Sequence, residues 1–516
     1  MTVGPTRRVL LSAAAALGAG GVLGACGSGG VGSVATSPDR SGAVSPAGSA
    51  VARAEARRRS SGRTVGVQLT ARPVTADLAG RHVSTWAYQP ALAGPVVRVR
   101  PGDRLRVLLR NELPEATSVH WHGLALRNDM DGVPVMTQAA VAPGGRFRYD
   151  FTVPDPGTYW FHPHQGLQLD RGLYAPLVVE DPADPGVDVD EVLVLDDWLD
   201  GISGTPQDQL DTLSRSTSTG SGMDGSGSGP SSRTMMGGSG MGGSGTGRNQ
   251  STALGGDAGD VAYPLYLVNG GPPGDRPTVT AAAGGKIRLR LVNAGSDTAF
   301  RVAVGGHRLT VTHADGRPVV PVTVDTVLLG MGERYDVELV ARSGVWPVYA
   351  AAEGKPGGAA AVLRTTDARS TPAPPPGTRP AELGRRLLRY GDLVPTVAQR
   401  LPARTVDRSY TVDLLGGMHR YRWTLGGDAA RLDVHSGERI RIVMRNQTLM
   451  WHPMHLHGHS FALADHAGVR KDTVNVLPQQ QVSIDFDADN PGQWAYHCHN
   501  TYHLSAGMMS TVSYRQ

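Results

Sequence analysis

One pattern of alternating apolar and polar residues occurs three times along the chain. Residues 99–111 read VRPGDRLRVLLRN, residues 281–293 read AAAGGKIRLRLVN, and residues 434–446 read VHSGERIRIVMRN. Each copy has a Gly, an apolar residue three positions later and an Asn nine positions after the Gly. Side chains alternate between two faces along a strand, so each copy predicts a β-strand. The three copies together predict three related β-domains.

A second pattern follows each predicted strand. Gly157 precedes the run TYWFHPH and Gly492 precedes QWAYHCH, so that the first His comes five residues after the Gly in both copies. The middle copy begins at Gly344, reads GVWPVYA and has no His in that place. We therefore expect paired histidines in the first and third domains and none in the second.

These repeats and the composition between them predict the domain organisation. We place the β-domains at residues 64–185, 261–368 and 396–516, with a Pro-containing linker at 369–395. Residues 203–260 are rich in Gly, Ser and Thr, which is the composition of a disordered insertion. This insertion also contains four methionines: Met223, Met235, Met236 and Met241.

Composition narrows the class of protein further. Gly (68 residues) and Pro (36 residues) make up about a fifth of the 516 residues, which favours short strands and turns over long helices. The net charge is +4 and the many Arg are scattered rather than gathered in a stripe, so nucleic-acid binding is not expected. After residue 30, no apolar run reaches the roughly 20 residues that a membrane span needs.

The N-terminus has the features of an export signal. Arg7 and Arg8 precede an apolar run from Val9 to Ala25, and the paired arginines predict export by the Tat route. The run ends in LGAC, which resembles a bacterial lipobox, so Cys26 is the predicted lipidation site; ordinary cleavage beside an incidental Cys is the alternative. Residues 27–63 then form the predicted flexible tether. The protein is thus expected in the cell envelope, lipid-anchored to the outer face of the cytoplasmic membrane.

Ten of the 17 histidines fall into four tight clusters. Residues two apart on a strand point to the same face, so each His-x-His can present two imidazoles side by side. Four such pairs at matching places in two repeats predict metal binding rather than scattered structural histidines. The clusters are His120 and His122; His162 and His164; His452, His455 and His457; and His497 and His499 with His503.

Cys498 lies between His497 and His499 and should point to the opposite face. Its thiolate would then serve a different metal, with His452, His503 and Met508 as possible partners. Two His, one Cys and a weak axial Met form the ligand set of a blue-copper centre. Zinc is the rival, although structural zinc sites prefer four strong ligands and rarely recruit Met.

These motifs resemble those of the multicopper oxidase family. The matching stretches are HWHG (120–123), HPH (162–164), HPMHLHGHSF (452–461) and HCHNTYHLSAGMM (497–509). The resemblance implies an all-β fold of three consecutive cupredoxin-like Greek-key β-barrel domains. It also implies four copper ions, with a three-copper cluster between the first and third domains and a second domain that acts as a spacer.

The resemblance also assigns a ligand set to each copper. The type 1 copper would be bound by His452, Cys498, His503 and Met508. The type 2 copper would be bound by His120 and His455. The type 3 pair would be bound by His122, His162, His164, His457, His497 and His499.

The implied activity couples one-electron oxidation of a reductant at type 1 copper to four-electron reduction of O₂ to water. Cys498 is covalently linked along the chain to both His497 and His499, which gives electrons a short path between the sites. Asp131 matches the family's acidic residue beside the cluster and is a candidate proton donor. Its alternative role is that of a turn residue in the Asp131-Gly132 pair.

The first hypothesis for the reductant is Cu(I), in copper resistance. Thioether sulfur favours Cu(I), and Met450 lies where cuprous oxidases of the family have a Met on the substrate side; core packing is its alternative role. The Met-rich insertion would recruit copper, or its methionines are incidental. A laccase acting on phenols and aromatic amines is the second hypothesis, and a non-catalytic copper-binding or scaffold protein is the third. We expect a monomer.

Overall fold

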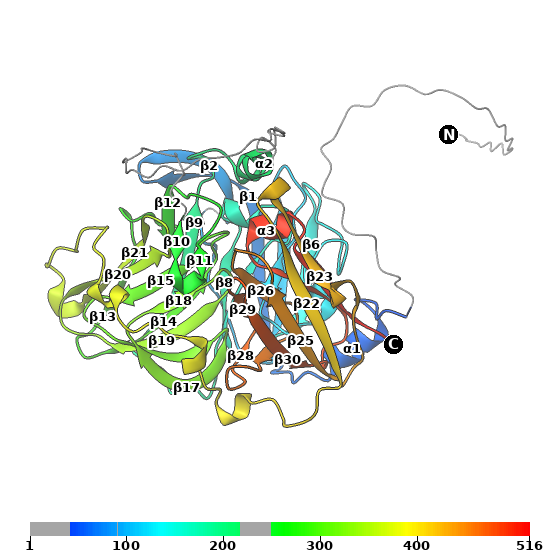
Figure 1. Cartoon of the computed structure of the whole chain (residues 1–516). Coiled ribbons are helices and arrows are strands. Elements are labelled where there is room, and N and C mark those ends of the chain that lie inside the picture. Colours follow the sequence, from blue (N-terminus) through cyan, green and yellow to red (C-terminus); the bar gives the residue numbers. More distant parts are fainter. Residues whose placement is uncertain (1–41, 90, 217–248) are drawn as a thin grey trace, which may run out of the picture. The chain divides into compact units, whose positions relative to one another are not determined.

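The three repeated stretches each form an interior strand of a sheet. The computed structural model describes residues 42–89, 91–216 and 249–516, and these described residues belong to one compact unit. The repeated strands are β4 (Arg104–Asn111), β14 (Lys286–Asn293) and β25 (Arg439–Asn446). Each pairs in parallel with an earlier strand and antiparallel with a later one. The strand prediction for all three repeats is confirmed, and Figure 1 labels two of these strands, β14 and β25.

The first domain consists of two four-stranded sheets. One has the order β2 (Arg81–Tyr88), β1 (Thr64–Leu78), β4 and β6 (Arg146–Thr152). The other has the order β3 (Val97–Val99), β8 (Ala175–Val179), β7 (Gly157–His162) and β5 (His120–His122). Along β4, Leu105, Val107 and Leu109 are buried and alternate with exposed or half-buried residues, as the sequence pattern requires.

The second domain also consists of two sheets, which have six and five strands. One has the order β12 (Leu265–Val268), β9 (Val189–Trp198), β14, β19 (Arg334–Val340), β16 (Leu309–Ala314) and β17 (Arg317–Val324). The other has the order β13 (Thr278–Ala281), β21 (Gly358–Thr365), β20 (Val345–Ala352), β15 (Phe300–Val304) and β18 (Val327–Leu329). In β14 even Arg288 and Arg290 are buried: Arg288 donates to Asp184 and Glu338, and Arg290 donates to Thr158 of the first domain.

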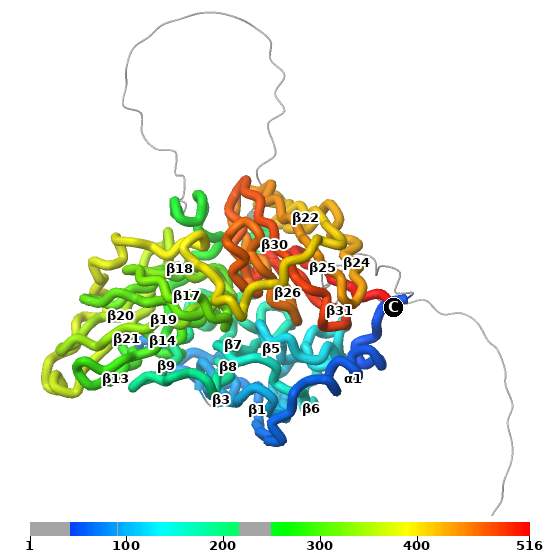
Figure 2. The backbone as a smooth tube through the Cα atoms, turned by 90° about the horizontal axis from the view of Figure 1, so that it is seen from below, coloured from blue at the N-terminus to red at the C-terminus, as the bar shows by residue number. Residues whose placement is uncertain are grey.

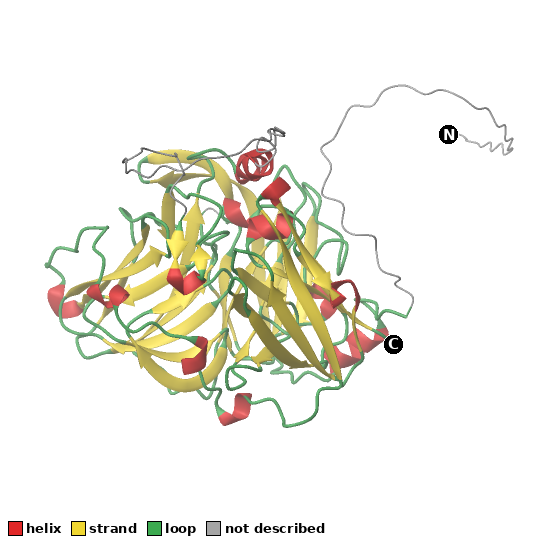
Figure 3. Cartoon of the chain, in the orientation of Figure 1, coloured by secondary structure: helices red, strands yellow, loops and turns green. Residues whose placement is uncertain are grey.

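The third domain has the same two layers. One sheet has the order β23 (Arg422–Gly427), β22 (Arg408–Gly417), β25, β30 (Gln481–Asp487), β27 (Phe461–Leu463) and β28 (Arg470–Lys471). The other has the order β24 (Leu432–Val434), β32 (Met509–Tyr514), β31 (Gln493–Cys498), β26 (His452–Leu456) and β29 (Thr473–Val476). Strands dominate all three domains, as Figure 3 shows.

The Asn that ends each repeat has the same structural role in all three domains. Asn111, Asn293 and Asn446 each donate from the side-chain amide to two backbone carbonyls, and each accepts a backbone N–H two residues further on. One of these carbonyls belongs to a residue 30 or 36 positions later. The Asn therefore ties the end of the repeated strand to a distant loop or strand of its own domain.

The ordered structure extends beyond the domain boundaries drawn from the sequence. The second domain begins at β9, not at residue 261, because β9 pairs with both β14 and β12. The linker over 369–395 is also structured: Leu383, Leu388 and Leu393 are buried, and residues 381–384 form the short helix η5 (Ala381–Gly384). Composition missed these contacts because they are made by single leucines within Pro- and Arg-rich stretches.

Both ends of the 203–260 insertion are structured. Helix α2 (Pro206–Ser216) precedes residues 217–248, and the short strands β10 (Gln250–Ser251) and β11 (Gly256–Asp257) follow them. The four methionines that motivated the copper-recruitment hypothesis lie outside the described residues, as does Cys26 with the predicted signal 1–26. Among the described helices, none has the length and apolar character required to cross a membrane.

Part of the predicted tether is an ordered arm. Residues 49–56 form α1 (Ser49–Ala56), whose Val51 is buried, and the N–H of Val44 donates to the carbonyl of Tyr514 at 2.8 Å. Ala43 also pairs with Arg515, so the arm lies beside the C-terminus (Figure 2). Val51 is the one buried residue of α1, which is too weak a pattern to see in the sequence.

Candidate metal centres

Two pairs of strands present the histidines that the sequence analysis singled out. His120 of β5 pairs with His162 of β7 in the first domain, and His455 of β26 pairs with His497 of β31 in the third. The antiparallel register therefore places two His-x-His motifs next to each other within each domain. His503 lies on α3 (Thr501–Ser505), where the Asn500 side chain accepts the N–H groups of Tyr502 and His503 and caps the helix.

Eight imidazoles from the two domains meet in one cluster. His120 stacks on His457 with ring centroids 3.7 Å apart, and His122 stacks on His455 at 3.8 Å. The Nε2 atom of His497 lies 3.0 Å from Nε2 of His457 and 3.4 Å from Nε2 of His164. Contacts this close between ring nitrogens are favourable when a cation lies between them. The full set is His120, His122, His162, His164, His455, His457, His497 and His499.

The donor atoms of this cluster fit a metal site. Within the part of the chain that the structure describes, several buried ring nitrogens have no hydrogen-bond partner. A buried polar atom without a partner is costly, so these nitrogens are suited to metal ions. They are Nε2 of His120, Nδ1 of His122, Nε2 of His162, Nε2 of His455 and both nitrogens of His499.

Burial keeps the imidazoles in the form that binds metals. Desolvation lowers the pKa of His122, His455 and His457 well below its usual value, and neighbouring histidines lower it further. Desolvation also lowers the pKa of His497 to about 4. Neutral imidazole is the metal ligand, so burial prepares these side chains for binding.

In His120, His122 and His455 the ring nitrogen that points away from the cluster is held by a hydrogen bond, which fixes the tautomer. His120 Nδ1 donates to the carbonyl of Asp131 at 2.9 Å, and His455 Nδ1 donates to the carbonyl of Asp472 at 2.8 Å. His122 is oriented the other way, with Nε2 donating to Asp472 Oδ1 at 3.1 Å and Nδ1 facing the cluster. Sequence analysis missed Asp472, which lies 350 residues from His122.

Asp131 reaches the cluster, as the resemblance implied. It is fully buried, and its Oδ2 accepts from His457 Nδ1 at 2.9 Å. Burial raises the pKa of its carboxyl, while His120 opposes that shift. The turn is also real: Gly132 has φ +81°, and a Cβ there would lie 1.8 Å from the carbonyl oxygen of Val119. Asp131 therefore contacts an imidazole and also enters a turn that requires Gly.

A second, separate group of donors surrounds Cys498. Its Sγ lies 3.7 Å from Nδ1 of His452 and 3.6 Å from Nδ1 of His503, and these two nitrogens are 3.2 Å apart. Met508 is buried directly before β32, and its carbonyl accepts the N–H of Cys498 at 3.1 Å. Burial raises the pKa of the Cys498 thiol, so a metal would have to displace its proton.

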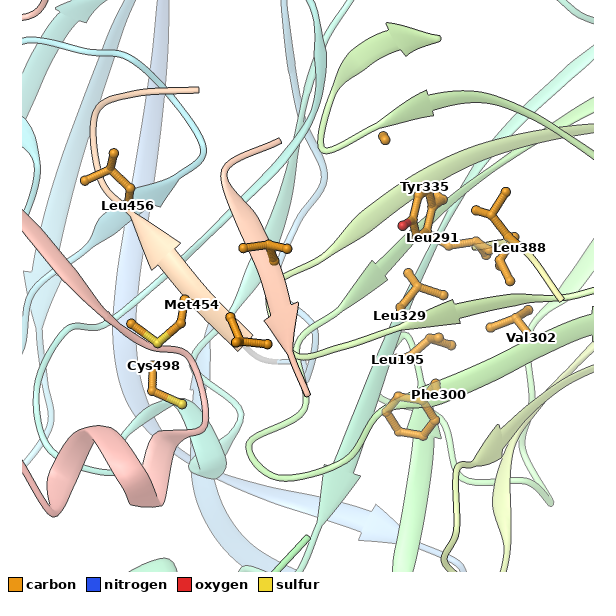
Figure 4. Packing of buried hydrophobic residues seen from close by; sticks show 14 of the residues in the cluster. Leu195, Leu291, Phe300, Val302, Leu329, Tyr335, Leu388, Met454, Leu456 and Cys498 are labelled. Carbon is orange, nitrogen blue, oxygen red and sulfur yellow. The ribbon is translucent and has the colours of Figure 1, made fainter. Parts of the chain in front are cut away.

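Strand alternation separates the two groups of donors. Cys498 faces the apolar interior of the third domain opposite Met454, as Figure 4 shows, whereas His497 and His499 belong to the cluster on the other face. The two groups are thus joined through the backbone of one strand and the residue that follows it. The sequence-based expectation for the direction of Cys498 agrees with this packing.

The surroundings of Cys498 include residues that the sequence analysis did not select. Thr448 Oγ1 lies 2.9 Å from His452 Nε2, and Asp260 Oδ2 accepts from His503 Nε2 at 3.0 Å. Trp423 packs on the His503 ring with centroids 4.1 Å apart. Met450 is only 4% exposed and lies in the apolar core, as the packing alternative for this residue required.

The chain is similar to known proteins along almost its whole length. Family models described as multicopper oxidase match residues 70–184, 190–368 and 405–516. Multicopper oxidase MmcO of Mycobacterium tuberculosis is 44% identical over 93% of both chains. Copper resistance protein A of Escherichia coli is 28% identical over 86% of this chain and 91% of its own.

A solved structure is also similar. The multi-copper oxidase from Pseudomonas thermotolerans is 25% identical with a TM-score of 0.63, and the match covers 87% of this chain and 99% of that chain. The two-sheet domains are cupredoxin-like, and the family uses copper, O₂ and a reductant. With two groups of donors that fit metal ions and matches along almost its whole length, the chain belongs to the multicopper oxidase family and is an oxidase that uses O₂.

Proposed function

We propose that this oxidase holds four copper ions and that its reductant is Cu(I), in copper resistance. His452, Cys498, His503 and Met508 would hold the type 1 copper, and the eight clustered imidazoles would hold the type 2 copper and the type 3 pair. When bound, these ions would accept electrons one at a time from the reductant and supply four of them to O₂, which with four protons from the solvent gives two waters. His457 and Asp131 would hold a proton beside the cluster.

The observation that carries the choice of reductant is the complete burial of both imidazoles beside Cys498. His452 and His503 are each 0% exposed, and Thr448 and Asp260 occupy their outer nitrogens. A phenol ring would therefore have no imidazole edge to contact. Thr448 and Asp260 form a layer over the two imidazoles. Cu(I) bound to a residue outside this layer would remain a suitable electron donor.

Soft and anionic groups are available in that layer. Tyr421 donates its hydroxyl to Asp260 Oδ2 at 2.9 Å, and Met418, three residues before Tyr421, is 43% exposed. Thioether sulfur favours Cu(I), so Met418 is a candidate for the first contact with the ion. Arg420 and Tyr421 have φ +57° and +40°, an unusual backbone that fixes the position of this turn.

The ends of the Met-rich segment lie in the same region. Helix α2, which precedes residues 217–248, packs against the turn η8 (His419–Tyr421), and Asp257, which follows those residues, pairs with Met450. The match to copper resistance protein A supports the same reductant, whereas fungal laccases among the relatives support the phenol alternative.

The test compares Cu(I) and a simple phenol as reductants for copper-loaded protein, with O₂ uptake as the readout. Met418→Leu, and a variant with the four segment methionines changed to Leu, are expected to lower the Cu(I) rate about fivefold, or ~1 kcal/mol. The phenol rate should stay unchanged. A control variant changes four serines of that segment to Leu. Equal losses with both reductants, or a wild type that oxidises only the phenol, would reject Cu(I) as the reductant.

For localisation, we propose Tat export and lipidation at Cys26, with the folded chain held at the cell envelope as a monomer. The twin arginines and the LGAC sequence support this proposal. Cys26→Ala should move the protein from the membrane fraction to the soluble fraction of fractionated cells. An unchanged distribution would contradict the anchor.

A further inference from the structure

A buried ion pair links the second domain, which supplies no imidazole to the cluster, to the cluster's edge. Arg334 of β19 donates from Nη1 and Nη2 to the two carboxylate oxygens of Asp472, both at 2.7 Å. Arg334 is 0% exposed and Asp472 is 1% exposed. A two-point guanidinium–carboxylate contact fixes the plane of the carboxylate as well as its position.

Asp472 contacts a histidine from each side of the cluster. Its Oδ1 accepts from Nε2 of His122, which belongs to the first domain, and its carbonyl accepts from Nδ1 of His455, which belongs to the third. Thr473 Oγ1 lies 3.2 Å from both of those nitrogens. A metal ion is an unsuitable occupant between Asp472 and these rings, because the guanidinium of Arg334 already binds both carboxylate oxygens.

The backbone of this acid is held from the second domain as well. Asp315 Oδ2 accepts the N–H groups of Asp472 and Thr473, each at 3.2 Å, and its Oδ1 accepts the N–H of Arg334 at 2.9 Å. Lys471 Nζ lies 3.0 Å from carboxylate oxygens of both Asp315 and Glu333. The second domain thus fixes Asp472 by its main chain and by its side chain.

Two glycines provide the space for this arrangement. A Cβ on Gly123, which has φ +86°, would lie 2.5 Å from Arg334 Nη2 and 2.6 Å from Asp472 Oδ2. A Cβ on Gly332 of the second domain would lie 3.0 Å from ring atoms of both His122 and His499. Because Gly123 of the HWHG motif has no side chain, the ion pair of Arg334 and Asp472 can lie directly beside the end of β5.

His122 shows why this ion pair matters for metal binding. Nδ1 of His122 faces the cluster, whereas Nε2 is the inward atom of His120, His162 and His455. His122 can offer Nδ1 only if Nε2 carries the proton, and Asp472 is the carboxylate that accepts that proton's hydrogen bond.

We propose that Arg334 is a positioning residue of the three-copper cluster, which acts through Asp472 to fix the ring orientation of His122 and His455. The second domain is then part of the metal site and not only a spacer. This inference rests on the assignment of the eight imidazoles to copper that is proposed above.

The test measures copper binding rather than turnover alone. Arg334→Lys keeps the charge but loses the two-point contact, which limits the risk of unfolding. We expect the copper of the cluster to be held 10- to 100-fold more weakly in a chelator competition, about the usual effect of losing a partner of a ligand. Electron paramagnetic resonance should show that part of the type 3 pair is no longer coupled, while the blue absorbance of the type 1 centre is unchanged. Asp472→Asn should have at least as large an effect.

Arg290→Lys is the matched control. Arg290 is another buried arginine of the second domain, but its partners are Asp190, Asp336 and Thr158. A purely structural role for Arg334 would make both variants lose stability alike without a selective change at the cluster. Unchanged affinity for the cluster copper in Arg334→Lys, or an equal loss of that affinity in Arg290→Lys, would overturn the proposed role of Arg334. Either result would leave the assignment of the eight imidazoles to copper intact. A wild type that binds only type 1 copper would overturn the cluster assignment as well.

Discussion

The first and second domains use the same strand position in opposite ways. His162 on β7 comes five residues after Gly157, and Tyr349 on β20 comes five residues after Gly344. His162 faces imidazoles of the third domain across the cluster, with its ring 5.2 Å from that of His499. Tyr349 instead packs with alanines of its own sheet and with Leu383 from the linker.

This difference shows what the outer face of a two-sheet domain requires. The face must be covered, and the cover can be a metal cluster shared with another domain or an apolar segment of the same chain. In the second domain the small side chains of Ala303, Ala351 and Ala360 leave space on this face. Leu383 and the ring of Tyr349 fill that space. The loss of histidines in the middle repeat is therefore compensated by apolar packing.

The most direct way to break this comparison is to truncate the two equivalent residues. Tyr349→Ala should lower the free energy of unfolding by about 3 kcal/mol, because a large buried ring is lost, and leave the copper content unchanged. His162→Ala should lower O₂ uptake by at least about a hundredfold if His162 is a direct ligand, as proposed above. Its apoprotein should lose less stability than that of Tyr349→Ala: the hydrogen bond from Nδ1 to the carbonyl of Pro163 is lost, but the buried Nε2 has no partner among the described residues to lose.

The measurements are urea unfolding of the apoproteins and copper analysis of the loaded proteins. If Tyr349→Ala lost copper and His162→Ala lost as much apoprotein stability as Tyr349→Ala, the two faces would not differ in the way described.

A smaller effect is expected at the cover itself. Leu383→Ala removes the linker side chain that closes the apolar face, and Leu383 is 8% exposed. We expect a loss of about 2 kcal/mol in apoprotein stability, at the low end for a buried leucine, with full copper content. Leu383→Met is the control and should cost under ~1.5 kcal/mol, because its volume is similar. Equal stability of both variants with the wild type would mean that the linker does not cover this face.

The smallest expected effect is that of a substitution at Val135 in the first domain, which should change stability without changing copper binding. Val135 is 85% exposed and has φ +69°, a backbone that is unfavourable for a β-branched residue. Val135→Gly removes roughly 1–2 kcal/mol of strain. Gly also gives the unfolded chain more conformational freedom, which lowers the free energy of unfolding by roughly 0.5–1 kcal/mol.

The net gain should be about 0.5–1 kcal/mol in unfolding experiments, with unchanged copper content and O₂ uptake. Val135→Ala keeps the unfavourable φ and should be close to wild type. A loss of copper in Val135→Gly would show that the loop after Asp131 contributes to the cluster through its shape.

The strands and the histidine pairs could be predicted because they depend on residues close together in the sequence. The alternation in 99–111 gives β4, and the spacing of His497, Cys498 and His499 gives their opposite directions. Asp472 and Asp260 could not be predicted in this way. They contact His122 and His503 over 350 and 243 residues of chain, and neither belongs to a motif.

The ordered arm was missed for a related reason. Its position depends on backbone pairing with Tyr514 and Arg515 at the far end of the chain, which no local pattern encodes.

The arrangement of the cluster also sets an order of events in time. The histidines of the first domain leave the ribosome long before those of the third, and synthesis at ~5–20 residues per second separates His164 from His452 by roughly 15 to 60 seconds. During that interval the first half of the metal site has no counterpart. The arm at residues 42–44 likewise waits for Tyr514, because it pairs there. Assembly of the cluster of eight imidazoles is therefore a late, post-synthetic step, and a chain that stops short of the last domain leaves bare imidazoles on its surface.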